Sequence, residues 1–145
     1  MPTPWAYFDT SVLVKRYVRE PGSSRAQTLL RRYRFLTSAI APVELLSALC
    51  RRRGTGELPE RDFAVILSSI RKDRVHWELV EVSGLVIGRS EELVQVADVR
   101  TLDAIHVASA LVFQTATGFA LPFVTGDTRQ REAASRLGLD VAWVG

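Results

Sequence analysis

The sequence predicts a single α/β domain over residues 1–145, with a mostly parallel central sheet flanked by helices in three layers. Two observations predict this fold class. Short apolar runs alternate with longer helical patterns along the whole chain. The runs at 5–8 and 122–125 are apolar on both faces, as expected for central strands that are covered by helices on both sides. A chain of 145 residues is also long enough to bury a substantial core.

The expected elements follow in chain order. Apolar segments predict strands at 5–8, 35–38, 75–82, 122–125 and 140–144. The third segment alternates apolar and polar residues, which predicts a half-exposed or edge strand. Helical patterns predict helices at about 11–19, 24–33, 41–53, 59–73, 83–97, 101–116 and 128–137. Pro42 and Pro59 fall where the first turn of a helix tolerates proline.

The charge balance suits a polyanionic partner without proving one. The chain has 19 Lys and Arg against 16 Asp and Glu, a formal net charge of +3. If several acids belong to one site, the remaining surface is distinctly basic. Basic residues gather in and around the first helices, at Arg25, Arg31, Arg32, Arg34, Arg51, Arg52, Arg53, Arg71, Lys72 and Arg74. They either hold phosphates at the rim of a site or form a solvated helix face.

The cysteine count and the hydropathy of the sequence indicate the cellular compartment. The single Cys50 permits no intrachain disulfide, which fits a reducing, cytoplasmic setting. Residues 104–126 carry no Asp, Glu, Lys or Arg and are long enough to span a bilayer. Because this stretch contains polar residues, Gly118 and Pro122, a buried helix, a turn and a buried strand explain it better. We therefore expect a cytoplasmic protein that has no membrane segment.

Four acidic residues interrupt apolar segments: Asp9, Glu44, Asp103 and Asp127. Asp9 follows the first expected strand and Asp127 the fourth, so both belong at the carboxyl edge of a parallel sheet, where ligands bind. Glu44 and Asp103 fall early in two of the expected helices. Several buried carboxylates need a compensating cation. The sequence therefore predicts that the four carboxylates converge on one edge and hold a divalent metal ion.

Each acid taken alone also has a simpler interpretation. Asp9 and Asp127 could only cap the helices that follow them. Glu44 faces away from Leu45 and its apolar neighbours, so it could be solvated. Asp103 should be buried, because its helix is apolar nearly all round, and a helix N-terminus offsets only about 0.3–1 kcal/mol of that cost. Their joint placement is what favours a site.

The donor set indicates the metal. Ligands that are all oxygen atoms favour Mg²⁺ or Mn²⁺. Zinc is disfavoured because Cys50 stands alone and His76 and His106 have no ligand spacing. His106 is best interpreted as a helix histidine with satisfied hydrogen bonds, and general-base work is a minor alternative. No nucleophile elbow, glycine-rich phosphate loop or Cys–His signature is present. Metal activation of water and binding of a phosphoryl group remain as the chemistry.

The segments around the four acids carry a family resemblance. They span residues 8–15, 41–49, 102–111 and 123–134, and the third contains the pattern Asp-Ala-x-His-x-Ala, the most specific of the four. In order and spacing they resemble the acidic motifs of PIN-domain ribonucleases, above all the small VapC toxins of prokaryotic toxin–antitoxin pairs. The resemblance implies Mg²⁺- or Mn²⁺-dependent cleavage of RNA, with the metal held by Asp9, Glu44, Asp103 and Asp127.

The resemblance also implies supporting residues and partners. Thr125 matches a hydroxyl residue of the family, and Ser11 would assist by hydrogen bonding near Asp9. Asp98 is a possible extra ligand, although a surface acid is the simpler interpretation. The implied partners are a second copy of the chain, as a homodimer, and a cognate antitoxin that packs into an apolar groove. Leu13, Val14, Tyr17 and Leu58 could line that groove, although core packing is the default for each.

Three alternatives stay open at this point. A PIN nuclease of RNA processing, without a toxin role, would share all the motifs. A non-enzymatic, receiver-like signalling module is disfavoured because Asp9 is followed by Thr10 rather than by a second acid. A phosphatase of the haloacid-dehalogenase type is disfavoured because it would require an acid at Ser11.

Overall fold

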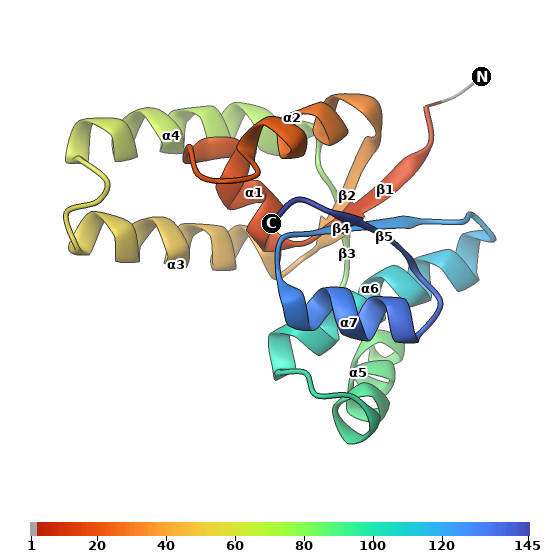
Figure 1. Ribbon diagram of the computed structural model, residues 1–145. Coiled ribbons are helices and arrows are strands. Elements are labelled where there is room, and N and C mark those ends of the chain that lie inside the picture. Colours follow the sequence, from red (N-terminus) through yellow and green to blue (C-terminus); the bar gives the residue numbers. More distant parts are fainter. Residues whose placement is uncertain (1–2) are drawn as a thin grey trace.

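The computed structural model describes residues 3–145 and has a five-stranded, fully parallel sheet at its centre (Figure 1). Its strands are β1 (Trp5–Phe8), β2 (Arg34–Ser38), β3 (Glu78–Val80), β4 (Pro122–Thr125) and β5 (Asp140–Trp143). The strand order is β3-β2-β1-β4-β5, so the direction of winding reverses between β1 and β4. Receiver domains have the order 2-1-3-4-5 instead, which argues against the receiver-like alternative.

Helices cover both faces of the sheet and complete the expected three-layer α/β fold (Figure 1). One layer consists of α1 (Thr10–Tyr17), α2 (Ser23–Arg32), α3 (Ala41–Gly54) and α4 (Glu60–Asp73). The other consists of α5 (Gly84–Val96), α6 (Thr101–Thr117) and α7 (Thr128–Arg136). Helices α3 and α4 form a hairpin that projects away from the sheet (Figure 1). No helix within residues 3–145 is long and apolar enough to cross a bilayer.

The third strand is shorter than the sequence predicts. Residues 75–82 were expected to form it, but β3 covers Glu78–Val80 and a 3₁₀ turn, η1, covers Arg74–His76. The backbone N–H of Trp77 donates to the carbonyl of Arg74 at 3.1 Å, which closes this turn. Val75 is therefore 77% exposed rather than packed on the sheet. The expectation of an edge position is confirmed.

The alternation of side chains along β1 divides the core into two faces. Tyr7 points to the side of α5, α6 and α7, where it stacks on Phe123 with ring centroids 5.3 Å apart. Ala6 and Phe8 point to the opposite side and pack with buried residues of α1 and α2. Because both faces of the strand are covered, its residues are apolar throughout. Asp9 therefore directly follows a strand that ends inside the core.

A third apolar cluster fills the space between α1, α3 and α4. Leu13, Val14 and Leu58 are buried in it, and Tyr17 is packed against it. These are the residues that were considered for an antitoxin groove. The default interpretation of core packing is therefore confirmed for Leu13, Val14 and Leu58, and Tyr17 is partly buried against the same cluster.

Gly22 is required where the loop after α1 meets the C-terminal segment. Its φ is +89°, and a Cβ atom there would lie 1.7 Å from the carbonyl oxygen of Val144. We expect Gly22→Ala to lower the free energy of unfolding by about 3 kcal/mol or more, because positive φ and overpacking add. Gly118→Ala is the matched control, since Gly118 has φ +75° but nothing within 4 Å. Urea unfolding should show a loss of only about 1 kcal/mol for the control.

Candidate active site

The site lies at the carboxyl ends of β1 and β4, the neighbouring strands between which the winding reverses. Such a switch point is where open parallel sheets bind ligands. Asp9 follows β1 and caps α1, with its Oδ1 accepting from the N–H of Val12 at 3.4 Å. Asp127 follows β4 and caps α7, with its Oδ1 accepting from the N–H of Gln130 at 3.0 Å. Capping and site formation are thus compatible roles for both acids.

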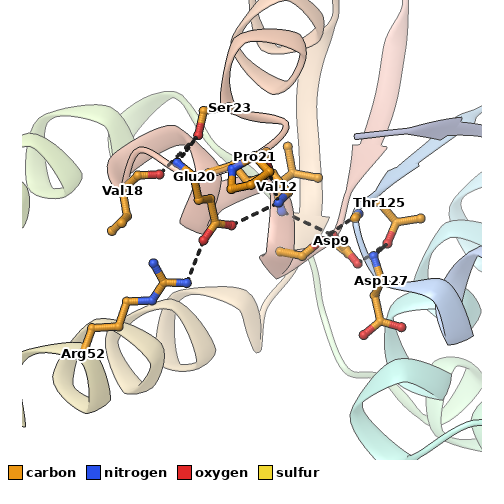
Figure 2. A network of polar contacts seen from close by, with 12 residues as sticks. Asp9, Val12, Val18, Glu20, Pro21, Ser23, Arg52, Thr125 and Asp127 are labelled. Atoms are coloured by element: carbon orange, nitrogen blue, oxygen red, sulfur yellow. Dashed lines mark hydrogen bonds and ion pairs between the residues drawn. The ribbon is translucent and has the colours of Figure 1, made fainter. Parts of the chain in front are cut away.

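Asp9 is fully buried and held by two hydroxyl groups. Ser11 Oγ donates to its Oδ1 at 2.5 Å, and Thr125 Oγ1 donates to its Oδ2 at 2.6 Å. The same Thr125 oxygen accepts from the backbone N–H of Asp127 at 2.9 Å, which links the two acids (Figure 2). Ser11 Oγ likewise accepts from the N–H of Gly126 at 2.9 Å. The two residues expected to support the site are therefore the direct partners of Asp9.

Glu44 is half-buried on the first turn of α3, and its side-chain contacts come from α1 and α6. Thr10 Oγ1 donates to Glu44 Oε1 at 2.7 Å, and His106 Nε2 lies 2.6 Å from the same oxygen. Tyr7 Oη lies 2.7 Å from the other ring nitrogen of His106. Burial pushes the pKa of Glu44 upward, but the hydrogen bonds from His106 and Thr10 outweigh it, so the pKa lies below its ordinary value.

Asp103, in the first turn of α6, is half-buried rather than buried. The apolar face of α6 packs into the core, but Asp103 lies at the N-terminal end of the helix, where its side chain is partly exposed. Gln130 Nε2 donates to Asp103 Oδ1 at 2.8 Å. Burial raises the pKa of Asp103, and the negative charges of Asp127 and Glu44 raise it further. Burial likewise raises the pKa of Asp9, to which Asp127 adds.

A hollow of about 650 Å³ opens between these elements, and we call it the carboxylate hollow. Its walls are formed by Glu44, Arg100, Thr101, Leu102, Asp103, Gly126, Asp127, Thr128 and Arg129. Three of the four predicted acids thus line one cavity. The fourth, Asp9, adjoins it through Thr125 and Asp127. The structure therefore brings all four to the same edge of the sheet.

The residues present fit a divalent cation. All four candidate ligands are carboxylates, and burial, with a smaller addition from the neighbouring negative charges, raises the pKa values of Asp9 and Asp103. Gln130 Oε1, on the side chain that holds Asp103, is buried without a hydrogen-bond partner. A hydrated cation in the hollow would supply both the missing charge and a donor. Within residues 3–145 no three such side chains already surround one point, so the carboxylates would have to rotate to share one ion.

The basic residues around the hollow are not those singled out from the sequence. None of the ten early basic residues lines it, whereas Arg100 and Arg129 do. Arg100 precedes α6 and Arg129 lies in the first turn of α7, so both sit at the edge where the acids converge. Arg51 and Arg52 line a separate hollow that also includes Ser11. Asp98 is exposed and is not among the residues of either hollow.

Besides Thr10, which donates to Glu44, two further residues contact the acids and were not predicted to do so. His106 was interpreted as a histidine with satisfied bonds, which is correct, but one of its partners is Glu44. Gln130 was not considered, although it binds Asp103 through its side chain and Asp127 through its backbone. A helical spacing signal existed for both. His106 lies three positions after Asp103, and Gln130 lies three positions after Asp127, on the same helix face in each case.

The PIN domain family model matches residues 6–135, which include all four acids. The chain belongs to the PIN domain family. Ribonuclease VapC46 from Mycobacterium tuberculosis is 34% identical over 136 residues, which cover 93% of this chain and 94% of the relative. The expected resemblance to PIN-domain proteins of the VapC type is therefore confirmed.

Solved structures show the same PIN fold. VapBC2 from Rickettsia felis, bound to a DNA fragment from its promoter, superposes with a TM-score of 0.64 at 13% identity, over 97% of this chain and 98% of that chain. A toxin–antitoxin complex from Klebsiella pneumoniae has a TM-score of 0.62 at 19% identity, over 86% and 88%. PAE2754 from Pyrobaculum aerophilum has a TM-score of 0.60 at 16% identity, over 96% and 84%. Identities this low support the fold alone.

Proposed function

We propose that this PIN-domain protein is a metal-dependent endoribonuclease and the toxin of a VapBC-type toxin–antitoxin pair. The observation that carries the proposal is the convergence of Asp9, Glu44, Asp103 and Asp127 on one edge of the sheet. The ribonuclease name of the relative, VapC46, supports the activity. The toxin–antitoxin complexes among the solved structures support a cognate antitoxin as partner.

The four carboxylates would hold Mg²⁺ or Mn²⁺, which activates water for attack on a phosphodiester and neutralises charge on the phosphate. The chain's own residues prepare the ligands. Ser11 and Thr125 fix both oxygens of Asp9, so its orientation does not depend on the metal. The side chain of Gln130 fixes Asp103 in the same way. Side chains held in this way would leave the ligands fewer arrangements than a free carboxylate cluster has.

Arg100 and Arg129 would bind phosphates of the RNA near the reacting group, because they line the same hollow as three acids. We expect the double variant Arg100→Ala with Arg129→Ala to bind RNA more weakly and to reduce the slope of log affinity against log salt by about 1.4, about 0.7 per phosphate on a single strand. A matched variant, Arg61→Ala with Arg71→Ala on exposed positions of α4, should keep the slope. Equal slopes for both pairs would show that the hollow does not hold phosphates.

Purified protein with Mn²⁺ tests the activity directly. Total cellular RNA should acquire a small set of internal cuts, mapped by sequencing the new ends, and the cuts should disappear in EDTA. A folded wild-type protein that cuts no cellular RNA would contradict the proposal. Expression of the chain alone should stop growth, and the antitoxin should relieve this. Unaffected growth with intact cleavage would favour the RNA-processing alternative.

A homodimer is the second proposed assembly, and α5 offers the surface for it. Leu85 and Val96 share one flank of this helix and are 75% and 68% exposed. Beside them Gly84 and Gly88, one turn apart, line a mostly apolar hollow of about 520 Å³ between α5 and α6. Small residues at this spacing let a second helix approach closely. Light scattering should give the mass of two chains, and a monomer at micromolar concentration would exclude this assembly.

A further inference from the structure

A row of three hydrogen-bonded side chains runs from the core to the carboxylate hollow. Tyr7 Oη lies 2.7 Å from His106 Nδ1, and His106 Nε2 lies 2.6 Å from Glu44 Oε1. Tyr7 and His106 are fully buried, whereas Glu44 is half-buried and lines the hollow. The three come from β1, α6 and α3, so the row connects elements that are far apart in the sequence. Nothing in the capping or metal-ligand roles of the acids accounts for it.

The contacts of His106 set the direction of its hydrogen bond to Glu44. A carboxylate oxygen can only accept, so His106 Nε2 carries the hydrogen and donates it to Glu44. Nδ1 on the other side of the ring lies within hydrogen-bond distance of the hydroxyl of Tyr7. The ring of Tyr7 is itself immobile, because it is stacked on Phe123 with an interplanar angle of 6°. The row is therefore anchored at its inner end by the packing of the sheet.

The hydrogen bonds to Glu44 use only one of its two carboxylate oxygens. His106 and Thr10 both contact Oε1, and within residues 3–145 Oε2 has no hydrogen-bond partner. Glutamate has three rotatable side-chain bonds, so an unsupported Glu44 would sample many positions of this second oxygen. Binding Oε1 from two directions restricts the carboxylate to one orientation. Donors behind a ligating carboxylate or histidine act in this way in metal sites.

We propose that His106, set by Tyr7, is a positioning residue that holds Glu44 with one oxygen free to bind the divalent cation of the carboxylate hollow. This inference rests on the proposed metal dependence, but not on RNA being the substrate. It assigns His106 no proton transfer and no contact with the reacting atoms. It also explains the spacing in the Asp-Ala-x-His-x-Ala segment. Asp103 lines the hollow, and His106, three residues later on the same helix, holds Glu44.

Metal affinity, measured by calorimetric titration of Mn²⁺ into the RNA-free protein, tests the proposal. His106→Leu should weaken Mn²⁺ binding by about 10–100-fold, the usual cost of losing an outer partner of a ligand. His106→Gln, which keeps a donor toward Glu44, should recover part of this loss. Tyr7→Phe keeps the imidazole but removes the hydroxyl partner of Nδ1, so a smaller loss of Mn²⁺ affinity is expected. It also keeps the test decisive if the His106 variants do not fold.

The coupling between the two residues distinguishes positioning from a general packing role. Glu44→Gln combined with His106→Leu should lose no more affinity than Glu44→Gln alone, because the donor acts only through that carboxylate. Ser90→Ala is the control, since Ser90 is also buried but lies on α5, where its hydroxyl donates to the carbonyl of Val86. Unchanged Mn²⁺ affinity in folded His106→Leu or additive losses in the double variant would overturn the inference. Normal coupling in a protein that cuts no RNA would overturn the proposed substrate alone.

Discussion

Asp9→Asn is expected to reduce RNA cleavage by at least about 100-fold while leaving the protein folded. The neutral amide is a poor ligand for Mg²⁺ or Mn²⁺, and the bound metal supplies several kcal/mol of transition-state stabilisation. The fold should persist because Asp9 is buried as an uncompensated charge when no metal is bound. In EDTA at neutral pH the variant should even melt about 2–5 °C above the wild type. Single-turnover cleavage and thermal unfolding measure the two effects.

Asp140→Asn is the matched control for this substitution. Asp140 is exposed at the first residue of β5, at the sheet edge opposite the carboxylates, so the same chemical change should alter neither cleavage nor melting. A folded Asp9→Asn protein that cuts RNA within a factor of ten of the wild type would remove Asp9 from the site.

Metal binding should stabilise the protein strongly at neutral pH and only weakly at acid pH. Mn²⁺ at 100 times its dissociation constant adds about 2.7 kcal/mol to the free energy of unfolding, which raises the melting temperature by roughly 10 °C. Protons compete for the same oxygens, because burial raises the pKa values of Asp9 and Asp103. The shift in melting temperature should therefore shrink steadily as the pH is lowered, and differential scanning fluorimetry at several pH values measures it.

The metal-free protein should show the opposite trend. The pKa values of Asp9 and Asp103 are raised from 3.8, so charging them destabilises the fold as the pH climbs from 3.8 through the raised values. Glu44 and Glu20 have lowered pKa values, so their contribution is already complete above 4.5 and constant beyond it. In EDTA, the difference in melting temperature between Asp9→Asn and wild type should thus widen as the pH rises from 4. A difference that does not change with pH would contradict this account of the buried charge.

The parts of the fold that follow from local patterns could be predicted from the sequence. Apolar runs gave β1 and β4 with their residue bounds, and the parallel arrangement placed Asp9 and Asp127 at one edge. The third strand could not be bounded in this way. Alternating apolar residues at an edge are compatible with a short turn as well as with a strand, and here the N–H of Trp77 closes a turn with the carbonyl of Arg74.

The partners of the acids were harder to predict than the acids themselves. A carboxylate in an apolar run is conspicuous because of its cost, whereas His106 and Gln130 are ordinary helix residues until the tertiary fold brings Glu44 and Asp103 beside them. The same reason explains the basic residues. The number of basic residues along the chain favours the arginine-rich helices as the phosphate-binding region. The fold instead brings Arg100 and Arg129, at the N-terminal ends of α6 and α7, to the carboxylate hollow.

The central claim is that carboxylates from separate elements together bind a divalent cation. Crystals soaked in Mn²⁺ test it most directly, because anomalous scattering locates the ion without reference to activity. We expect one strong peak in the carboxylate hollow, within coordination distance of oxygens of Asp9, Asp103 and Asp127, with Glu44 bound directly or through water. Manganese bound only elsewhere, or a hollow in which the arginines pair with the acids and no ion enters, would contradict the account.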